Sequence, residues 1–148
     1  MLKQILYIFF FSTIGLMATP SGDINQTEVL LNRLDMKSDK IYVIDFFASW
    51  CKSCQKELPL ISKVHNDKLV EVIGINVDKK KEDGEKFVKS LELPFRIIYD
   101  EDKSFIKSFD PVGFPALYYM KNGKVIHMIV GAVDNIDEQI AKDLKELK

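Results

Sequence analysis

The sequence has very few of the residues that bind metals through sulfur or imidazole. It contains two cysteines, Cys51 and Cys54, and two histidines, His65 and His127. A structural zinc site usually needs four such ligands, and neither histidine has the expected spacing from the cysteine pair. The sequence therefore argues against a zinc centre, and we expect no resident metal and no cofactor beyond a disulfide between the two cysteines.

The chain also lacks a large excess of charge of either sign. Its 21 basic and 22 acidic residues give a formal net charge of −1 at pH 7, which excludes the basic surplus typical of nucleic-acid binding. Internal repeats and low-complexity segments are absent as well. A length of 148 residues with 47% hydrophobic residues is that of one domain large enough to bury a core.

The longest apolar run lies at the N-terminus. One lysine precedes it, and the run itself, residues 5–17, is short for a membrane span. No cysteine follows at a lipid-attachment position. We expect residues 1–19 to be a secretory signal peptide or, because the cleavage motif is a poor match, an uncleaved membrane anchor. Residues 20–148 would then fold in the periplasm or on the extracytoplasmic side of the membrane, where disulfides persist.

A second apolar run, Ile41–Phe47, predicts a buried strand that leads directly into the cysteine pair. Residues 48–50 turn the chain, Cys51 lies where a helix is expected to begin, and Cys54 lies one turn deeper. A pair at this spacing can close a small disulfide ring. The first sulfur would lie beside free backbone N–H groups and the positive end of the helix dipole. Both effects favour the reactive thiolate, and Lys52 adds a positive charge nearby.

A purely structural disulfide is the alternative for this pair. Closing so short a loop constrains the unfolded chain only weakly, so the bridge would add little stability. A Cys-x-x-Cys motif between a strand and a helix is typical of a redox-active pair. We therefore expect Cys51 to be an exposed nucleophile and Cys54 to resolve the mixed disulfide. The Lys52-Ser53 pair between the cysteines would tune the redox potential.

Asp45 lies inside the apolar strand that precedes the cysteines. Burial there would desolvate its carboxyl group and raise its pKa. A carboxyl group behind the cysteines can exchange a proton with Cys54, directly or through a water molecule. The alternative is an aspartate that points to solvent from the other face of the strand.

Hydrophobic periodicity and turn residues divide the rest of the chain into helices and strands. Helices are predicted over residues 26–35, 51–66, 82–91, 102–109 and 136–147, and strands over residues 69–77, 95–99, 115–121 and 124–130. Asn122-Gly123 is a strong hairpin signal between the last two strands. Asp134 is expected to cap the final helix.

Two motifs resemble the thioredoxin superfamily. Residues 45–54 (Asp-Phe-Phe-Ala-Ser-Trp-Cys-Lys-Ser-Cys), followed by Glu57 and Pro59, resemble its active-site motif, and residues 112–115 (Val-Gly-Phe-Pro) resemble its cis-proline loop. Agreement of two separated motifs is more specific than a lone Cys-x-x-Cys. The resemblance covers roughly residues 40–147. It implies an α/β, thioredoxin-like fold in which helices flank a central mixed β-sheet.

The resemblance also assigns roles to residues around the cysteines. Asp45 matches the buried acid of the superfamily, and the peptide bond before Pro115 is expected to be cis. The backbone of Phe114 would receive an extended segment of the substrate. Trp50 and Phe114 are expected to form an apolar rim around Cys51, although simple packing is the alternative.

An extra helix and strand between Val77 and Asp110 resemble the TlpA/ResA/CcmG-like branch, as does the Cys-x-x-Cys-x-x-Glu-x-Pro pattern. This branch implies that Glu57 is a second active-site acid that modulates the thiol pKa; the alternative is a surface glutamate on an exposed helix. Two features depart from the branch. Residues 24–40 read as helix where a β-hairpin is usual, and Ala116 stands where threonine is common.

The branch consists of exported thiol-disulfide oxidoreductases. It implies an enzyme that reduces disulfides of specific partner proteins, such as the haem-attachment cysteines of apocytochrome c or copper-site thiols. A membrane-embedded donor would supply the electrons. The alternatives are an oxidant or isomerase of exported proteins, and a non-catalytic module that binds metal or haem through its two thiols. A peroxidase would place its cysteine in a Pro/Thr-rich context that this sequence lacks.

Overall fold

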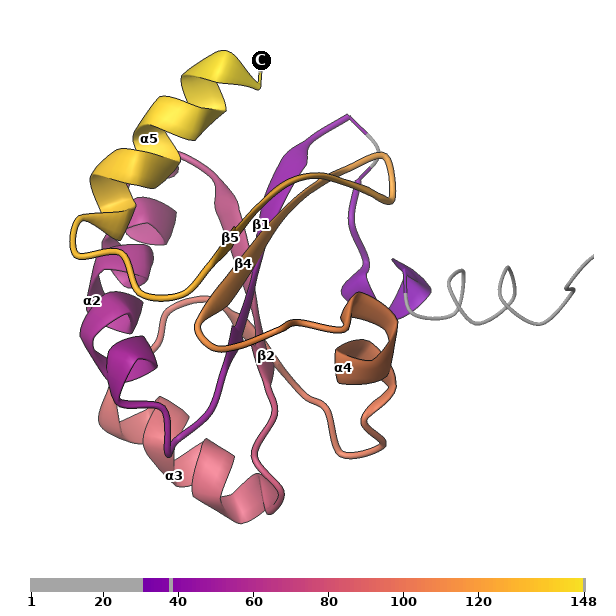
Figure 1. The fold of residues 1–148 in the computed structure, drawn as a ribbon, viewed down its shortest axis with the longest axis vertical. Coiled ribbons are helices and arrows are strands. Elements are labelled where there is room, and N and C mark those ends of the chain that lie inside the picture. Colours follow the sequence, from indigo (N-terminus) through magenta and orange to yellow (C-terminus); the bar gives the residue numbers. More distant parts are fainter. Residues whose placement is uncertain (1–30, 38, 148) are drawn as a thin grey trace, which may run out of the picture.

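A computed structural model of the chain describes residues 31–37 and 39–147, in which strands and helices alternate. The elements are β1 (Ile41–Phe47), α2 (Lys52–Asn66), β2 (Glu71–Asn76), α3 (Lys81–Ser90), β3 (Arg96–Tyr99), α4 (Ser104–Phe109), β4 (Ala116–Lys121), β5 (Lys124–Val130) and α5 (Ile136–Glu146). Figure 1 shows α2 and α5 on one face of a sheet and α4 on the other. Each predicted strand and helix within these residues is present.

The five strands form one mixed sheet in the order β3-β2-β1-β4-β5. The central strand β1 runs parallel to β2 and antiparallel to β4, and β3 extends the parallel side at one edge. The hairpin β4–β5 forms the other side, and both of its turn residues, Asn122 and Gly123, have left-handed backbone with φ values of 53° and 71°. The Asn-Gly turn and the mixed sheet confirm the predictions for this part of the chain.

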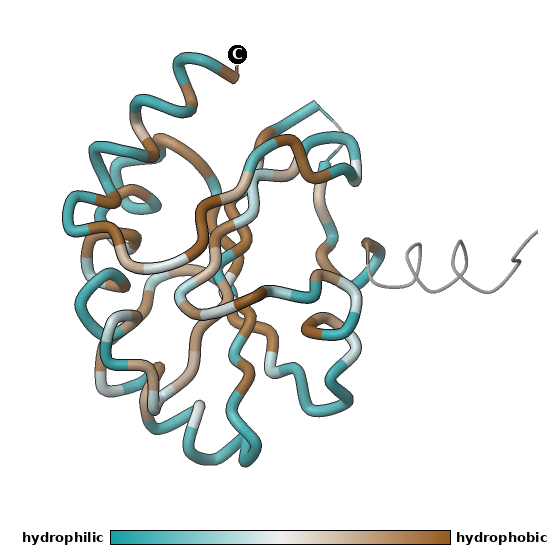
Figure 2. The backbone as a smooth tube through the Cα atoms, viewed as in Figure 1, coloured by the Kyte–Doolittle hydropathy of each residue, from teal (hydrophilic) through white to brown (hydrophobic). Residues whose placement is uncertain are grey.

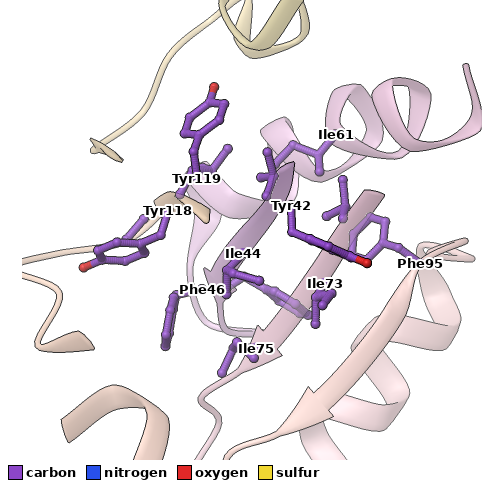
Figure 3. Packing of buried hydrophobic residues seen from close by; sticks show 14 of the residues in the cluster. Tyr42, Ile44, Phe46, Ile61, Ile73, Ile75, Phe95, Tyr118 and Tyr119 are labelled. Carbon is purple, nitrogen blue, oxygen red and sulfur yellow. The ribbon is translucent and has the colours of Figure 1, made fainter. Parts of the chain in front are cut away.

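The core follows from the hydrophobic pattern of the central strands. All of β1 except Ile41 is buried, which explains its almost continuous apolar run. Ile44 and Phe46 pair with Ile73 and Ile75 of β2, and Figure 3 shows these four side chains together in the core. Figure 2 shows the same division, with hydrophobic colour on the central strands and mostly hydrophilic colour on α3.

Helix α2 packs on this sheet through one row of apolar side chains. Leu58, Ile61 and Val64 recur at a spacing of three residues and are buried, as the sequence predicts. Pro59 lies inside the helix on its exposed side. The helix ends at Asn66, and Lys68, just after its C-cap, has a φ of 57° that lets Leu69 N–H bond to the carbonyl of Val64. Leu69 therefore belongs to the end of the helix, and β2 begins two residues later than predicted.

The caps of the last two helices also differ from expectation. Asn135, not Asp134, precedes the first turn of α5, and its side chain makes no capping hydrogen bond. Helix α4 starts at Ser104 because the carboxylate of Asp100 accepts the N–H groups of Phe105 and Ile106, a cap supplied from outside the helix. The sequence does not show that Asp100, four residues before the helix, rather than a residue at the helix start, caps α4.

The predicted insertion is present as α3 and β3 between β2 and α4. Phe87 and Val88 of α3 are half-buried against the core, and the ring of Phe87 lies 6.0 Å from that of Phe47. The insertion therefore covers the end of the sheet at which β1 leads into the cysteine pair.

The proposed export segment, residues 1–19, and most of the predicted helix over residues 26–35 lie outside the described residues. Residues 31–34 are helical, in agreement with the end of that prediction. Within the described part of the chain, no helix combines the length and apolar character needed to cross a membrane.

Candidate active site

The two cysteines form a disulfide at the start of α2, where the sequence places them. Their Cα atoms are 5.3 Å apart. The chain leaves β1 at Phe47 and turns through a hydrogen bond from Cys51 N–H to the carbonyl of Ala48, 3.1 Å long. Cys51 then occupies the N-cap position with extended backbone, and its sulfur accepts the N–H of Cys54 at 3.2 Å. The first sulfur therefore lies at the positive end of the helix.

Cys51 is less accessible than predicted. The sequence suggests an exposed nucleophile, but in the disulfide form Cys51 is only 6% exposed and Cys54 is 1% exposed. The prediction of an exposed residue is therefore wrong for this form, because the sulfur of Cys51 folds back over the first turn of α2. Cys51 is still the more accessible of the pair.

Asp45 is buried between the sheet and α2. It pairs with Leu117 across β1 and β4, and Leu117 shares its sheet face with Tyr119, whose hydroxyl donates to Asp143 of α5. Asp45 thus points toward the helices α2 and α5, so the solvent-facing alternative is wrong. Burial, followed by the nearby charge of Glu57, raises the pKa of Asp45 to about 8.

Glu57 is buried as well, on the same side of α2 as Cys54 and Leu58. Its Oε1 accepts the backbone N–H of Val133, in the loop between β5 and α5. Burial raises the pKa of Glu57, the Val133 hydrogen bond opposes this, and the charge of Asp134 adds to the rise. The surface-glutamate alternative is therefore wrong.

Both carboxyl groups keep one oxygen without a partner in the described part of the chain. These atoms are Asp45 Oδ1 and Glu57 Oε2, and neither is accessible to solvent. A buried carboxyl oxygen without a donor favours the protonated form of its group. The buried layer between the sheet and α2 therefore holds two carboxyl groups whose pKa values are raised, Asp45 to about 8.

An apolar rim lies beside the disulfide. Trp50 is 61% exposed, and its ring meets the ring of Phe114 edge-on with 5.7 Å between the centroids. The Phe114–Pro115 peptide bond is cis, as predicted. Strand β4 begins only at Ala116, so the backbone of Phe114 lies outside the pairing with β1. Val112, the first residue of the predicted proline loop, is 91% exposed and extends the apolar surface.

The remaining predicted site residues take the expected places. Lys52 is exposed in the first turn of α2, and Ser53 is half-buried between the two cysteines. The histidines lie elsewhere: His65 accepts the N–H of Val72, and His127 lies 3.6 Å from Asp143. Among the residues that the structure describes, no three His, Cys, Asp or Glu side chains are grouped so that they could hold a metal ion.

Two residues that contact each other, Ser49 and Asp78, were not expected from the sequence to contribute to the site. Asp78 accepts hydrogen bonds from Ser49, immediately before Trp50. The only sequence signal for this contact is a polar residue directly after a buried strand. That position is common for functional side chains in sheets with parallel strands, but it does not identify the partner.

Comparison with known proteins places this geometry in a family. The AhpC/TSA family model matches residues 17–128. The chain belongs to the AhpC/TSA family. The thiol-disulfide oxidoreductase ResA of Bacillus thuringiensis subsp. konkukian is 30% identical over 117 residues, which cover 76% of this chain. The matched part spans 66% of that protein, so about a third of the relative has no counterpart in the match.

Solved structures agree with this family. The thiol:disulfide interchange protein DsbE of Chlorobium tepidum has a TM-score of 0.67 and 25% identity, covering 76% of this chain and 83% of its own. StoA of Bacillus subtilis has a TM-score of 0.66 at 22% identity, covering 74% of this chain and 84% of its own, and shows the likeness of fold. The thioredoxin-like fold and the resemblance to the TlpA/ResA/CcmG-like branch are thus confirmed.

Proposed function

We propose that this chain is an exported thiol-disulfide oxidoreductase that reduces disulfides in specific partner proteins. The observation that carries the proposal is the Cys51–Cys54 disulfide at the start of α2, together with two buried carboxyl groups, Asp45 on the preceding strand and Glu57 one helical turn after Cys54. A structural bridge would need no acid behind it and would add little stability at this spacing. The naming of the ResA relatives as thiol-disulfide oxidoreductases supports the same conclusion.

The reaction starts from the dithiol form. The thiolate of Cys51 attacks one sulfur of the partner's disulfide, and the other partner sulfur leaves as a thiolate and takes up a proton. Cys54 then loses its proton and attacks Cys51, which releases the second partner thiol. The partner gains two electrons, and the Cys51–Cys54 disulfide re-forms. Asp45 faces α2 from the strand before the cysteines, and Glu57 follows Cys54 by one turn of that helix, so we assign them the proton-transfer role.

The rim binds the partner. Trp50, Phe114 and Pro115 form the substrate-binding residues, and the backbone of Phe114 pairs with an extended segment of the partner. Lys52 and Ser53 tune the potential of the pair from positions between and beside the sulfurs.

Features of the sequence support the compartment and the partner in this proposal. The apolar segment within residues 1–19 supports export to the periplasm or the extracytoplasmic face of the membrane. The resemblance to the TlpA/ResA/CcmG-like branch supports a reductant of haem-attachment cysteines in cytochrome c maturation. A membrane-embedded donor would return the disulfide to the dithiol by the same exchange chemistry.

Trapping of the mixed disulfide tests the proposal. Reduced Cys54→Ser protein lacks the resolving thiol, so we expect it to accumulate a covalent adduct with a peptide disulfide, visible by mass spectrometry. Cys51→Ser is the matched control and should give no adduct. Absence of an adduct with Cys54→Ser, or equal adducts with both variants, would contradict the proposal. Metal binding through both thiols without any adduct would favour the non-catalytic module.

A further inference from the structure

Ser49 lies two residues before Cys51, and its N–H, hydroxyl and carbonyl groups all make hydrogen bonds. Its N–H donates to Oδ2 of Asp78 at 2.9 Å, and its hydroxyl donates to Oδ1 of the same carboxylate at 2.7 Å. Its carbonyl accepts the side-chain amide of Gln55 at 3.1 Å. The next residue, Trp50, projects into solvent from this fixed point and contacts Phe114.

The carboxylate of Asp78 is itself held from the end of β2. The side-chain amide of Asn76 donates to Oδ2 of Asp78 at 2.8 Å, and Asp78 N–H donates back to Oδ1 of Asn76 at 3.3 Å. Asp78 is buried, and its carboxylate accepts three hydrogen bonds from residues that the structure describes. A carboxylate with that number of donors has little freedom to rotate, so it holds Ser49 in a fixed position.

The insertion supports this arrangement from two sides. The ammonium group of Lys103, just before α4, donates to the carbonyls of Val77 and Asp78 at 3.0 and 2.9 Å. The side chain of Asn76 packs against Gly84 of α3 so closely that any larger residue there would overlap it. Residues from both ends of the insertion therefore fix the segment that carries Asp78.

We propose that Asp78 is a positioning residue for disulfide exchange: it fixes Ser49 and thereby holds Trp50 and Cys51 in the geometry of attack. The inference rests on the proposed function and gives the insertion a role in it. Exchange requires the thiolate, the partner sulfur and the leaving sulfur to align, and small displacements of a reacting group reduce rates strongly. The thiolate moves with the backbone of Cys51, and Asp78 anchors that backbone through Ser49.

Two substitutions separate the hydrogen bonds of Asp78 from its negative charge. In Asp78→Asn, the amide oxygen can accept from Ser49 N–H and Asn76, and the amide nitrogen can donate to the Ser49 hydroxyl, which both donates and accepts. This variant keeps the contacts and removes the negative charge. Asp78→Ala removes both. Asp100→Ala is the matched control, because Asp100 is also a buried aspartate that accepts backbone hydrogen bonds but has none from Ser49.

The experiment measures the second-order rate constant with which reduced full-length protein attacks a small peptide disulfide, in the Cys54→Ser background. Circular dichroism establishes that each variant is folded. We expect Asp78→Ala to lower the rate constant by about tenfold or more, and Asp78→Asn and Asp100→Ala to stay within about twofold of the Cys54→Ser parent. Ser49→Ala removes one of the two contacts to Asp78 and should give an intermediate loss.

Three results would overturn the inference: an unchanged rate for Asp78→Ala, an equal loss for Asp78→Asn, or an equal loss for Asp100→Ala. The second would point to charge and the third to general destabilisation. If Asp78→Ala does not fold, the Ser49→Ala rate decides, and an unchanged rate would overturn the inference. Failure of the proposed function looks different, because the Cys54→Ser parent would then not react at all.

Discussion

Asp45 and Glu57 place two carboxyl groups in the buried layer between the sheet and α2, one from β1 and one from the helix itself. Each is nearly inaccessible to solvent, and burial raises the pKa of both. Such groups destabilise a folded protein once they ionise, so their presence needs a compensating use. Proton exchange with Cys54 is that use in the proposed reaction.

The raised pKa of Asp45 predicts how stability depends on pH. The folded protein keeps the proton up to about pH 8, whereas the unfolded chain loses it near the ordinary value of 3.8. Between these values the folded state binds more protons, so the free energy of unfolding falls as pH rises, by up to about 1.4 kcal/mol per pH unit. Asp45→Asn removes this contribution and should be more stable than wild type at pH 8.

Urea unfolding of the oxidised proteins at several pH values between 4 and 9 measures this difference. Asp45→Asn keeps Glu57 and the histidines, so the difference between the two proteins reports Asp45 together with its charge coupling to Glu57. The same slope in both proteins would mean that Asp45 titrates at its ordinary value.

The sequence predicts these residues to very different degrees. Asp45 is marked by the apolar residues on both sides of it, so its burial follows from the strand alone. Glu57 has the helical spacing of the buried side of α2, but a glutamate without a partner favours an exposed position. Its partner, the N–H of Val133, lies far along the chain and only the fold brings it close. The role of Asp78 depends on its contact with Ser49, and no local pattern encodes a pairing between loops at two strand ends.

At the scale of the elements, β2 fits against its neighbours because one residue has no side chain. Gly74 lies opposite Asp45 in the parallel pairing of β1 and β2. A Cβ atom at this position would lie 2.7 Å from Ile97 Cδ1 and 2.9 Å from Phe47 Cε1. Ile97 of the insertion and Phe47 of the central strand therefore fill the space that a side chain at Gly74 would occupy.

Gly74→Val should destabilise the protein by about 1–3 kcal/mol, because its added methyl groups overpack a filled layer. Gly113→Ala is the control, since a Cβ there meets nothing within 4 Å. The free energy of unfolding of both variants, measured in urea, checks this prediction. Equal stability of wild type and Gly74→Val would show that Ile97 and Phe47 can move aside without cost.

The elements themselves are predictable where local chemistry decides them. The run of β1, the apolar row of α2 and the Asn-Gly turn each specify one structure through neighbouring residues. The cap of α4 and the start of β2 differ from expectation, because Asp100 acts from outside the helix and Leu69 stays with the end of α2. Such contacts depend on the assembled fold.

At the scale of the whole molecule, the sheet brings the site together from separate parts of the chain. The cysteines follow β1, the cis-proline loop precedes β4, and the loop after β5 supplies the partner of Glu57. Because β1 lies between β2 and β4, Asp78 and Phe114 reach the same end of the sheet from its two sides. The insertion after β2 adds the support for Asp78.

The midpoint potential of the Cys51/Cys54 couple tests the central claim most directly. Trp50 is the chain's single tryptophan and adjoins Cys51, so its fluorescence can follow the reaction in glutathione or dithiothreitol buffers. A reductant of partner disulfides should show a reversible two-electron couple below about −200 mV. A value near about −120 mV would make the protein an oxidant of exported proteins, and the absence of a reversible couple would contradict the redox function itself.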